Sequence, residues 1–504
     1  MGAGFDGDVP MLEFLARMMV RRKSARGRRA ALVVAVAAAT QALPAAAIPV
    51  FNRQTGQNCQ ACHAGGQYPE LTPYGRMFKL TGYTIGRRTD VPLAMMALAS
   101  VSSVRNTSKS DDPSADFSKN DRVVLASASL FAGGRITDNL GAFLQYTYDP
   151  YASQDASGKY HGHAAADNMD IRYADRFVGT GHDLVFGVSA NNNPSVADPW
   201  NTAAAWMQYV PVPSPSSSQF IDGATPYPGY GVGGNTSGLT AYAFLDEHLY
   251  LEAGAYRSTR GVLAFMKLGQ PTSGLTRLQG NAPYLRAAWN VAWGASTLMI
   301  GGSTMRSRVY DDPSVADPAT LHRFRDSSVD AQYQWLLDPH ALTLQAVATR
   351  QQHRYPDSLA GQAPAFVDAQ GNPLPPSSPS DVLRLLRAKA SYTWRATYGA
   401  GISYFDLSGT TNTLNQSSGY DPLTGTITAT SAAAPSTRVN GNLTGNPRTT
   451  GETLEAYWLP WQNLRVGAQY TFYQRYNGSA RNYDGFGRNA SDNDSLFVYA
   501  WFAY

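Results

Sequence analysis

Apolar and polar residues alternate in short segments along most of the chain, from about residue 93 onward. The segments "LRVGAQYTF" (464–472), "LYLEAGAY" (249–256) and "ALTLQAVAT" (341–349) place apolar residues at every second position, with polar or small residues between them. Period-two alternation predicts β-strands that have one apolar and one polar side. Strands of a soluble β-sandwich alternate in the same way, so these segments alone predict an all-β protein without deciding its architecture.

The connections between the segments come in two lengths. Short turns are predicted at "ITDN" (136–139), "GTGH" (179–182), "DEH" (246–248), "WGA" (293–295), "LDPH" (337–340), "RAT" (395–397) and "PWQN" (460–463). Long connections are predicted around 106–120, 151–167, 191–236, 258–281, 309–321, 354–380, 408–447 and 475–491. Strict alternation of short and long connections is typical of bacterial outer-membrane barrels. The sequence therefore predicts a transmembrane, up-and-down antiparallel β-barrel of about 16 strands.

The C-terminal segment and the composition agree with a membrane barrel. In "SLFVYAWFAY" one face carries Leu496, Val498, Ala500, Phe502 and the terminal Tyr504. Only 15% of the residues are charged, and the chain contains 29 tyrosines and 9 tryptophans, as expected for a barrel with aromatic girdles. Part of the net charge of +4 comes from a basic cluster near the N-terminus, and no feature indicates a nucleic-acid partner.

The N-terminus resembles an export signal. Six arginines and lysines between positions 21 and 29 precede the apolar run "AALVVAVAAATQALPAAA", which ends in small residues. We therefore predict a signal peptide over 1–47, cleaved after Ala47, with an uncleaved anchor as the alternative. The acidic, mixed residues before this cluster leave Met18 or Met19 as alternatives to Met1 for the start. No later run of about 18 apolar residues predicts a transmembrane helix.

The only two cysteines of the chain lie in "GQNCQACHAGG" (56–66), as Cys59-x-x-Cys62-His63. This spacing attaches a c-type haem, because each thiol can form a thioether to the porphyrin and the histidine can supply an axial ligand to iron. A structural zinc site would need about four ligands, and the flanking residues do not resemble a thioredoxin-like motif. A simple disulfide remains an alternative. We predict one covalent haem c, held by Cys59 and Cys62, with His63 as the proximal iron ligand.

A short helix should follow the haem motif. Thr72 is a good N-cap, Pro73 fits the first turn, and Gly82 is placed to close the helix. We assign residues 48–90 to a monohaem cytochrome segment and residues 91–504 to the barrel. The segment is too short to bury a haem in its own helices, so we expect it to plug the barrel lumen. Arg76 and Lys79 could meet the haem propionates, or could be ordinary solvated cations.

The run "FNRQTGQNCQACHAGGQYPELTPYGRMFKLTGYT" (51–84), followed directly by barrel strands, resembles the fused monohaem cytochrome–porin family. Its best-known members are outer-membrane iron(II) oxidases of iron-oxidising bacteria. The resemblance implies an outer-membrane electron conduit that takes electrons from an extracellular donor, first of all Fe(II), and delivers them to a periplasmic c-type cytochrome. Such a protein would act as an iron(II):cytochrome c oxidoreductase. Two alternatives remain: a porin whose haem segment gates or senses, and an electron outlet to an external acceptor.

The distal haem ligand is predicted from the methionines near the motif. In "VPLAMMALAS" the two adjacent methionines point to opposite faces of the first strand, so one of them should face the lumen. We favour Met96 as the distal ligand, with Met95 or Met77 as alternates, and we rate packing of Met77 in its helix above ligation. Three groups in the long connections are weaker metal-binding candidates: Asp111, Asp112 and Asp116; Asp311, Asp312 and Asp317; and His161 and His163.

Overall fold

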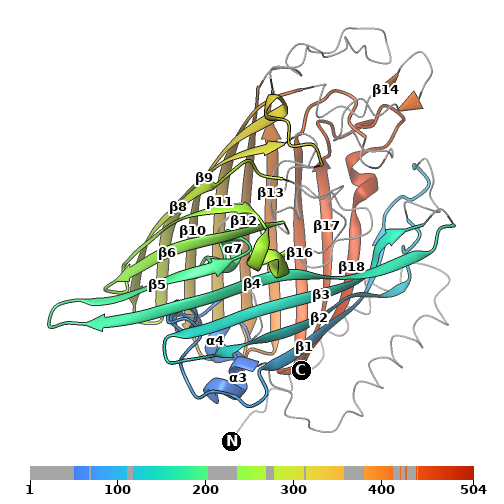
Figure 1. The fold of residues 1–504 in the computed structure, drawn as a ribbon. Coiled ribbons are helices and arrows are strands. Elements are labelled where there is room, and N and C mark those ends of the chain that lie inside the picture. Colours follow the sequence, from blue (N-terminus) through green and yellow to red (C-terminus); the bar gives the residue numbers. More distant parts are fainter. Residues whose placement is uncertain are drawn as a thin grey trace, which may run out of the picture. The chain divides into compact units, whose positions relative to one another are not determined.

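The computed structural model describes residues 50–66, 70–110, 117–155, 157–202, 235–267, 277–310, 314–356, 380–412, 420–421, 426–427, 439 and 441–504 (Figure 1). The predicted signal peptide and its cleavage site lie outside these residues. Within the described part of the chain, no helix is both long enough and apolar enough to span a membrane.

Sixteen of the described strands form one closed antiparallel barrel, which confirms the predicted fold class and strand number. The strands are β1 (Leu93–Val104), β2 (Val123–Arg135), β3 (Leu140–Gln154), β4 (Tyr160–Val178), β5 (Asp183–Asn191), β6 (Thr236–Leu245), β7 (Leu249–Ser258), β8 (Ala282–Trp293), β9 (Ser296–Tyr310), β10 (Leu321–Leu337), β11 (His340–Arg354), β12 (Ser380–Trp394), β13 (Tyr398–Gly409), β16 (Thr449–Trp461), β17 (Leu464–Arg475) and β18 (Ser495–Ala503). Each strand pairs with its neighbours in the chain, and β1 closes the barrel against β18. A separate two-stranded sheet contains β14 (Tyr420–Asp421) and β15 (Thr426–Ile427).

The alternation of short and long connections is also confirmed, with one exception. The predicted long connection at 151–167 is wrong, because β3 runs on to Gln154 and β4 already begins at Tyr160. Register shifts between Leu144 and Tyr146, and between Asp149 and Ser153, let these two strands stay paired through a stretch rich in Ser, Gly and His. His161 and His163 therefore lie on β4 rather than in a loop. A strand end that extends beyond the bilayer needs no apolar face, so its polar and turn-forming residues were mistaken for a connection.

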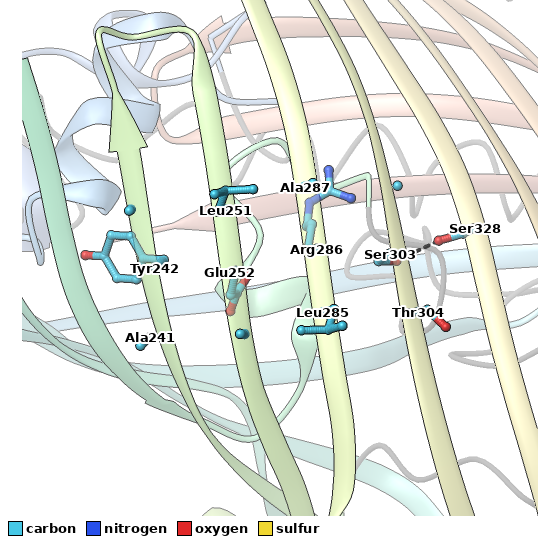
Figure 2. Close-up of a pocket in the computed structure, with 13 residues that line it drawn as sticks. Ala241, Tyr242, Leu251, Glu252, Leu285, Arg286, Ala287, Ser303, Thr304 and Ser328 are labelled. Atoms are coloured by element: carbon cyan, nitrogen blue, oxygen red, sulfur yellow. Dashed lines mark hydrogen bonds between the residues drawn. The ribbon is translucent and has the colours of Figure 1, made fainter.

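The barrel is apolar outside and polar inside, the reverse of a soluble protein. On neighbouring strands the outward Leu251 and Leu285 are 48% and 55% exposed, whereas the next residues, Glu252 and Arg286, are only 3% and 2% exposed. Figure 2 shows these side chains on β7 and β8, with the buried Tyr242 beside them on β6. Every second residue thus faces a hydrocarbon-compatible exterior, and the residues between them face the lumen.

Several charged groups inside the lumen form ion pairs with each other. The Arg286 guanidinium lies 2.7 Å from a carboxylate oxygen of Asp330 and 3.2 Å from one of Asp198. Arg172 and Asp170 form a second ion pair at 2.9 Å, and both side chains are fully buried. Such charges are tolerated in an enclosed interior because each has an opposite partner close by.

Several short helices accompany the strands: α3 (Val50–Thr55), α4 (Cys59–Cys62), α5 (Pro73–Leu80) and α7 (Pro194–Ala197), and the 3-10 turns η1 (Gly261–Met266), η3 (Pro318–Thr320) and η5 (Ala490–Asn493). The predicted helix near the haem motif is confirmed as α5. The Thr72 hydroxyl accepts the Gly75 N–H at 3.1 Å, and Gly82 takes a positive φ of 71° beyond the last turn. The Tyr83 N–H donates to the carbonyl of Phe78, which completes a Schellman-type C-cap.

The inside-out pattern predicts how an added charge affects stability. Val329 is exposed in the middle of β10, whereas Val123 begins β2 beside a long connection. We expect Val329→Arg to lower the free energy of unfolding in phospholipid vesicles by about 2–4 kcal/mol, and Val123→Arg by about 0–1 kcal/mol. Urea unfolding of both variants measures the difference. Equal costs at the two positions would mean that Val329 does not face the hydrocarbon core.

Candidate haem site

The helices α3 to α5 lie at the end of the barrel where the strands are joined by short turns (Figure 1). The sulfur of Cys59 lies 3.9 Å from the carbonyl oxygen of Gln462, in the turn between β16 and β17. At the β2–β3 hairpin, the Arg135 backbone N–H donates to the side-chain oxygen of Gln54 at 2.9 Å. These contacts hold the N-terminal segment at the short-turn end of the barrel, and α5 reaches inward from there.

Buried cations fix α5 to the barrel interior. The Arg76 guanidinium donates to the amide oxygen of Gln334 at 2.7 Å, and the Lys79 ammonium donates to the carbonyl oxygen of Asp198 at 2.7 Å. Burial lowers the pKa of Lys79 to about 8 and that of Arg76 to about 10. The alternative that these two residues are solvated cations is therefore wrong, since both are tied into the lumen.

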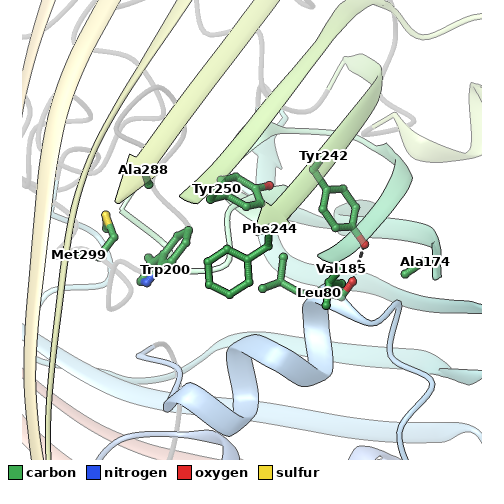
Figure 3. Packing of buried hydrophobic residues seen from close by; sticks show 9 residues of the cluster. All are labelled: Leu80, Ala174, Val185, Trp200, Tyr242, Phe244, Tyr250, Ala288 and Met299. Atoms are coloured by element: carbon green, nitrogen blue, oxygen red, sulfur yellow. Dashed lines mark hydrogen bonds between the residues drawn. The ribbon is translucent and has the colours of Figure 1, made fainter. Parts of the chain in front are cut away.

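Apolar packing also holds α5 against the barrel interior. Leu80, at the end of α5, packs against Trp200, Tyr242 and Tyr250 (Figure 3). The Tyr242 hydroxyl also donates to the Leu80 carbonyl at 2.5 Å. Trp200 follows α7, so the start of the long β5–β6 connection folds inward and meets α5. The stretch "NNPSVADPW" (192–200) was predicted only as part of the long connection at 191–236, but its Asp198 and Trp200 meet α5 inside the barrel.

The haem motif itself is a single helical turn. The Asn58 side chain caps α4 by accepting the Ala61 N–H at 3.2 Å, and the His63 N–H donates to the Cys59 carbonyl at 2.8 Å. Both cysteines are free thiols, so the alternative of a disulfide is not formed. Burial raises the pKa of Cys62 to about 11. Burial also lowers the pKa of His63 to about 4, which keeps its imidazole neutral and able to coordinate a metal.

The motif opens onto one cavity of about 570 Å³. This volume lies within the roughly 300–1,000 Å³ of cofactor sites. Both thiols and His63 line the cavity together with Met96. The aromatic part of its wall consists of Phe51, Phe78, Tyr83, Phe131, Phe143, Phe497, Tyr499 and Trp501. Two thiols and a neutral imidazole in a largely apolar cavity with eight aromatic side chains in its wall suit a covalently held porphyrin, so these residues fit haem c.

The three methionines named from the sequence have different positions. Met96 points inward, is 9% exposed and packs with Phe497 and Trp501 beside the cavity. Met95 is 53% exposed on the outer face of β1, and Met77 packs against the cluster around Trp200. Both Met95 and Met96 contribute to the cavity lining, but the alternation along β1 turns the Met96 side chain inward and the exposed Met95 side chain outward. Met96 is therefore the favoured candidate of the three, and its ligation of iron stays a prediction.

Most of the cavity wall was missed by sequence analysis. Phe131, Phe143 and Gln145 come from β2 and β3, and their positions depend on strand register, which the sequence does not fix. A usable signal existed on β18. Because the outward face there was assigned to alternate residues, Phe497 and Tyr499 between them had to face the lumen.

The weaker metal candidates do not converge. Asp111, Asp112, Asp116, Asp311 and Asp312 lie outside the described residues. The Asp317 carboxylate accepts the Ala319 N–H and caps η3, and His161 pairs with Asp155 at 2.8 Å. Among the residues that the structure describes, no three His, Cys, Asp or Glu side chains form a metal-binding group.

The close contact between α4 and α5 predicts the effect of one methyl group. A Cβ at Gly75 would lie 2.9 Å from the carbonyl carbon of Cys62 and 3.0 Å from its Cα. We expect Gly75→Ala to lower the local stability of the haem segment by about 1–3 kcal/mol, because backbone cannot move aside easily. Faster hydrogen exchange of the segment containing Cys62 is the measurement. Gly181→Ala is the control, since no atom lies within 4 Å of its added Cβ; equal exchange in both variants would contradict the tight contact.

No known protein family matches the chain by sequence, and no curated protein matches it. Solved structures match it over 82% of its length. They include OmpF of Salmonella typhi in complex with daunomycin (12% identity, 97% of that chain, TM-score 0.42), the channel DcaP of Acinetobacter baumannii (11%, 96%, 0.42) and OprB of Pseudomonas putida at high pH (12%, 94%, 0.43). At this identity and TM-score, the likeness concerns the porin-like barrel architecture alone.

Proposed function

We propose that this protein is an electron conduit of the bacterial outer membrane. It would carry electrons from an extracellular donor, with Fe(II) as the first candidate, to a periplasmic c-type cytochrome. A closed barrel with an apolar outer face, behind an export signal, supports the membrane location. The observation that carries the function is the cavity that Cys59, Cys62, His63 and Met96 share inside the barrel.

The bound haem c would supply reversible one-electron chemistry. Cys59 and Cys62 would hold it through thioethers, and the neutral imidazole of His63 would bind its iron. Phe51, Phe78 and the other aromatic residues of the wall exclude water from the site. Five of these aromatic residues, Phe131, Phe143, Phe497, Tyr499 and Trp501, lie on strands of the barrel, so the segment needs no complete cytochrome domain around it.

The extent of the cavity suits transfer across a membrane. On β3 its lining runs from Phe143 to Asp149, six residues that span about 20 Å along the strand, or about 15 Å of height at a tilt of about 40°. The lining also includes Gln462 in a short turn. The cavity would therefore place a single redox site within the apolar band of about 25 Å and shorten its distance to partners on both sides.

A porin with a gating haem segment is the second candidate, because the lumen carries many polar side chains and the architecture is porin-like. An electron outlet would use the same residues in the opposite direction. Current through single barrels in planar bilayers separates the porin from both electron conduits, since α3 to α5 and the α7 stretch fill the lumen of a conduit permanently.

Met96 and Met95 offer a matched pair of variants for the distal ligand. We expect Met96→Ala to lower the haem reduction potential, because a thioether ligand raises it. Met95→Ala should leave the potential unchanged, since that side chain points outward. Potentiometric titration of the two holoproteins measures this. A potential that is unaffected by Met96→Ala would remove Met96 as an iron ligand while leaving the covalent site intact.

The conduit itself is tested with outer-membrane vesicles. We expect anaerobic Fe(II) added outside to produce the absorption bands of reduced haem in the wild-type protein. The double variant Cys59→Ala, Cys62→Ala should insert as a barrel but retain no haem after denaturation, as mass spectrometry of the chain would report. Reduction by dithionite without any reduction by Fe(II) would show that the haem is present and would exclude Fe(II) as the donor. Absence of a covalent mass increase in the wild type would overturn the function.

A further inference from the structure

The outer face of the barrel carries an arginine lattice that the proposed electron transfer does not use. It comprises the exposed Arg306 and Arg308 on β9, Arg323 and Arg325 on β10, Arg350 and Arg354 on β11, and Arg384 on β12. These four strands are consecutive neighbours in the barrel wall (Figure 1). All seven residues lie toward the strand ends that join the long connections. We call this set the arginine lattice.

The register of the strands puts these arginines directly opposite one another. Arg323 pairs with Arg308 on one side and with Arg354 on the other, and Arg325 pairs with Arg306. On the next two strands Arg350 pairs with Arg384. Residues that are directly opposite have Cβ atoms about 4.5–5.5 Å apart, and like charges at such positions destabilise a sheet.

For five members of the arginine lattice, the described residues supply no neutralising acid. The acidic residues of these four strands are Asp326, Asp330 and Asp381. Asp330 and Asp381 are buried at 2% and 1% exposure, and Asp326 has a buried carboxylate oxygen and pairs across the strands with the buried Met305. Among the described residues, no carboxylate forms an ion pair with Arg306, Arg308, Arg323, Arg325 or Arg384. The repulsion among these five arginines would therefore be relieved by an anionic partner from outside the described part of the chain.

The height of the lattice identifies where that partner lies. Arg325 and Trp335 share the outward face of β10 ten residues apart, and so do Arg384 and Trp394 on β12. Ten residues span about 34 Å along a strand, or about 26 Å of height at a tilt of about 40°. The apolar band of an outer-membrane barrel is about 25 Å tall and has aromatic girdles at its edges. The tryptophans thus mark one edge of the band and the arginines the other.

We infer that the arginine lattice binds the phosphate groups of a phosphorylated glycolipid in the outer leaflet. Guanidinium groups bind phosphate with paired, charge-assisted hydrogen bonds. A lipid anchored in the outer leaflet holds its phosphates at the height of the lattice, which a soluble anion does not. This contact would fix the depth and orientation of the barrel in the membrane, and it does not depend on the haem.

The test uses the full-length protein in detergent and native mass spectrometry with phosphorylated lipid A. We expect the triple variant Arg308→Gln, Arg323→Gln, Arg325→Gln to bind this lipid about a hundredfold more weakly than the wild type. The matched control removes three exposed arginines away from the lattice, Arg87→Gln, Arg88→Gln and Arg395→Gln. That control should bind as the wild type does.

The wild-type protein supplies a measurement that does not depend on the folding of a variant. Lipid A treated with phosphatase should bind it far more weakly than the phosphorylated form. Equal binding of the two lipids, or equal binding by the lattice and control variants, would overturn the proposal. Displacement of the lipid by inorganic phosphate at the lipid's own concentration would also overturn it, since the surface would then be a site for a soluble anion.

Discussion

The backbone hydrogen bonds between β1 and β18 are the constraint on which the rest of this structure depends. Hydrocarbon offers no partner to an open strand edge, so the wall can cross a membrane only if its first and last strands pair. The register from Met96 against Ala503 to Val104 against Ser495 provides that closure. Once the wall is closed, alternate residues are forced inward, and the polar ones among them must find partners inside the lumen.

Those partners come from two segments that are far apart in the sequence and that both enter the lumen. The N-terminal helices bring Arg76 and Lys79, and the start of the β5–β6 connection brings Asp198. Asp198 contacts both Lys79 and Arg286, so it links the haem segment to the ion pairs of the wall. Rigid attachment of this kind is what a binding site needs, because a cofactor held on the wall inherits the precision of the strands.

The sequence was sufficient to predict those features that local chemistry determines. Strand number, turn positions and the caps of α5 depend on alternation, on turn residues and on Thr72 and Gly82, and these signals are local. The connection at 155–159 was mispredicted because polar strand ends in solvent look like loops. The cavity wall was missed for another reason: Phe143 and Trp501 are far apart in sequence, and only barrel closure and register bring them to the same site.

The contacts that hold α5 in the barrel also oppose opening of the lumen. Opening the lumen would require α5 to leave, and Arg76 would then lose Gln334 while Lys79 would lose the Asp198 carbonyl. Leu80 would leave the aromatic cluster around Trp200 at the same time. Hydrogen bonds from charged groups contribute about 1.5–3 kcal/mol each, and a buried leucine contributes a similar amount. A barrel that opens as a gated porin would have to offset these terms in its open state, whereas a conduit would keep the contacts throughout.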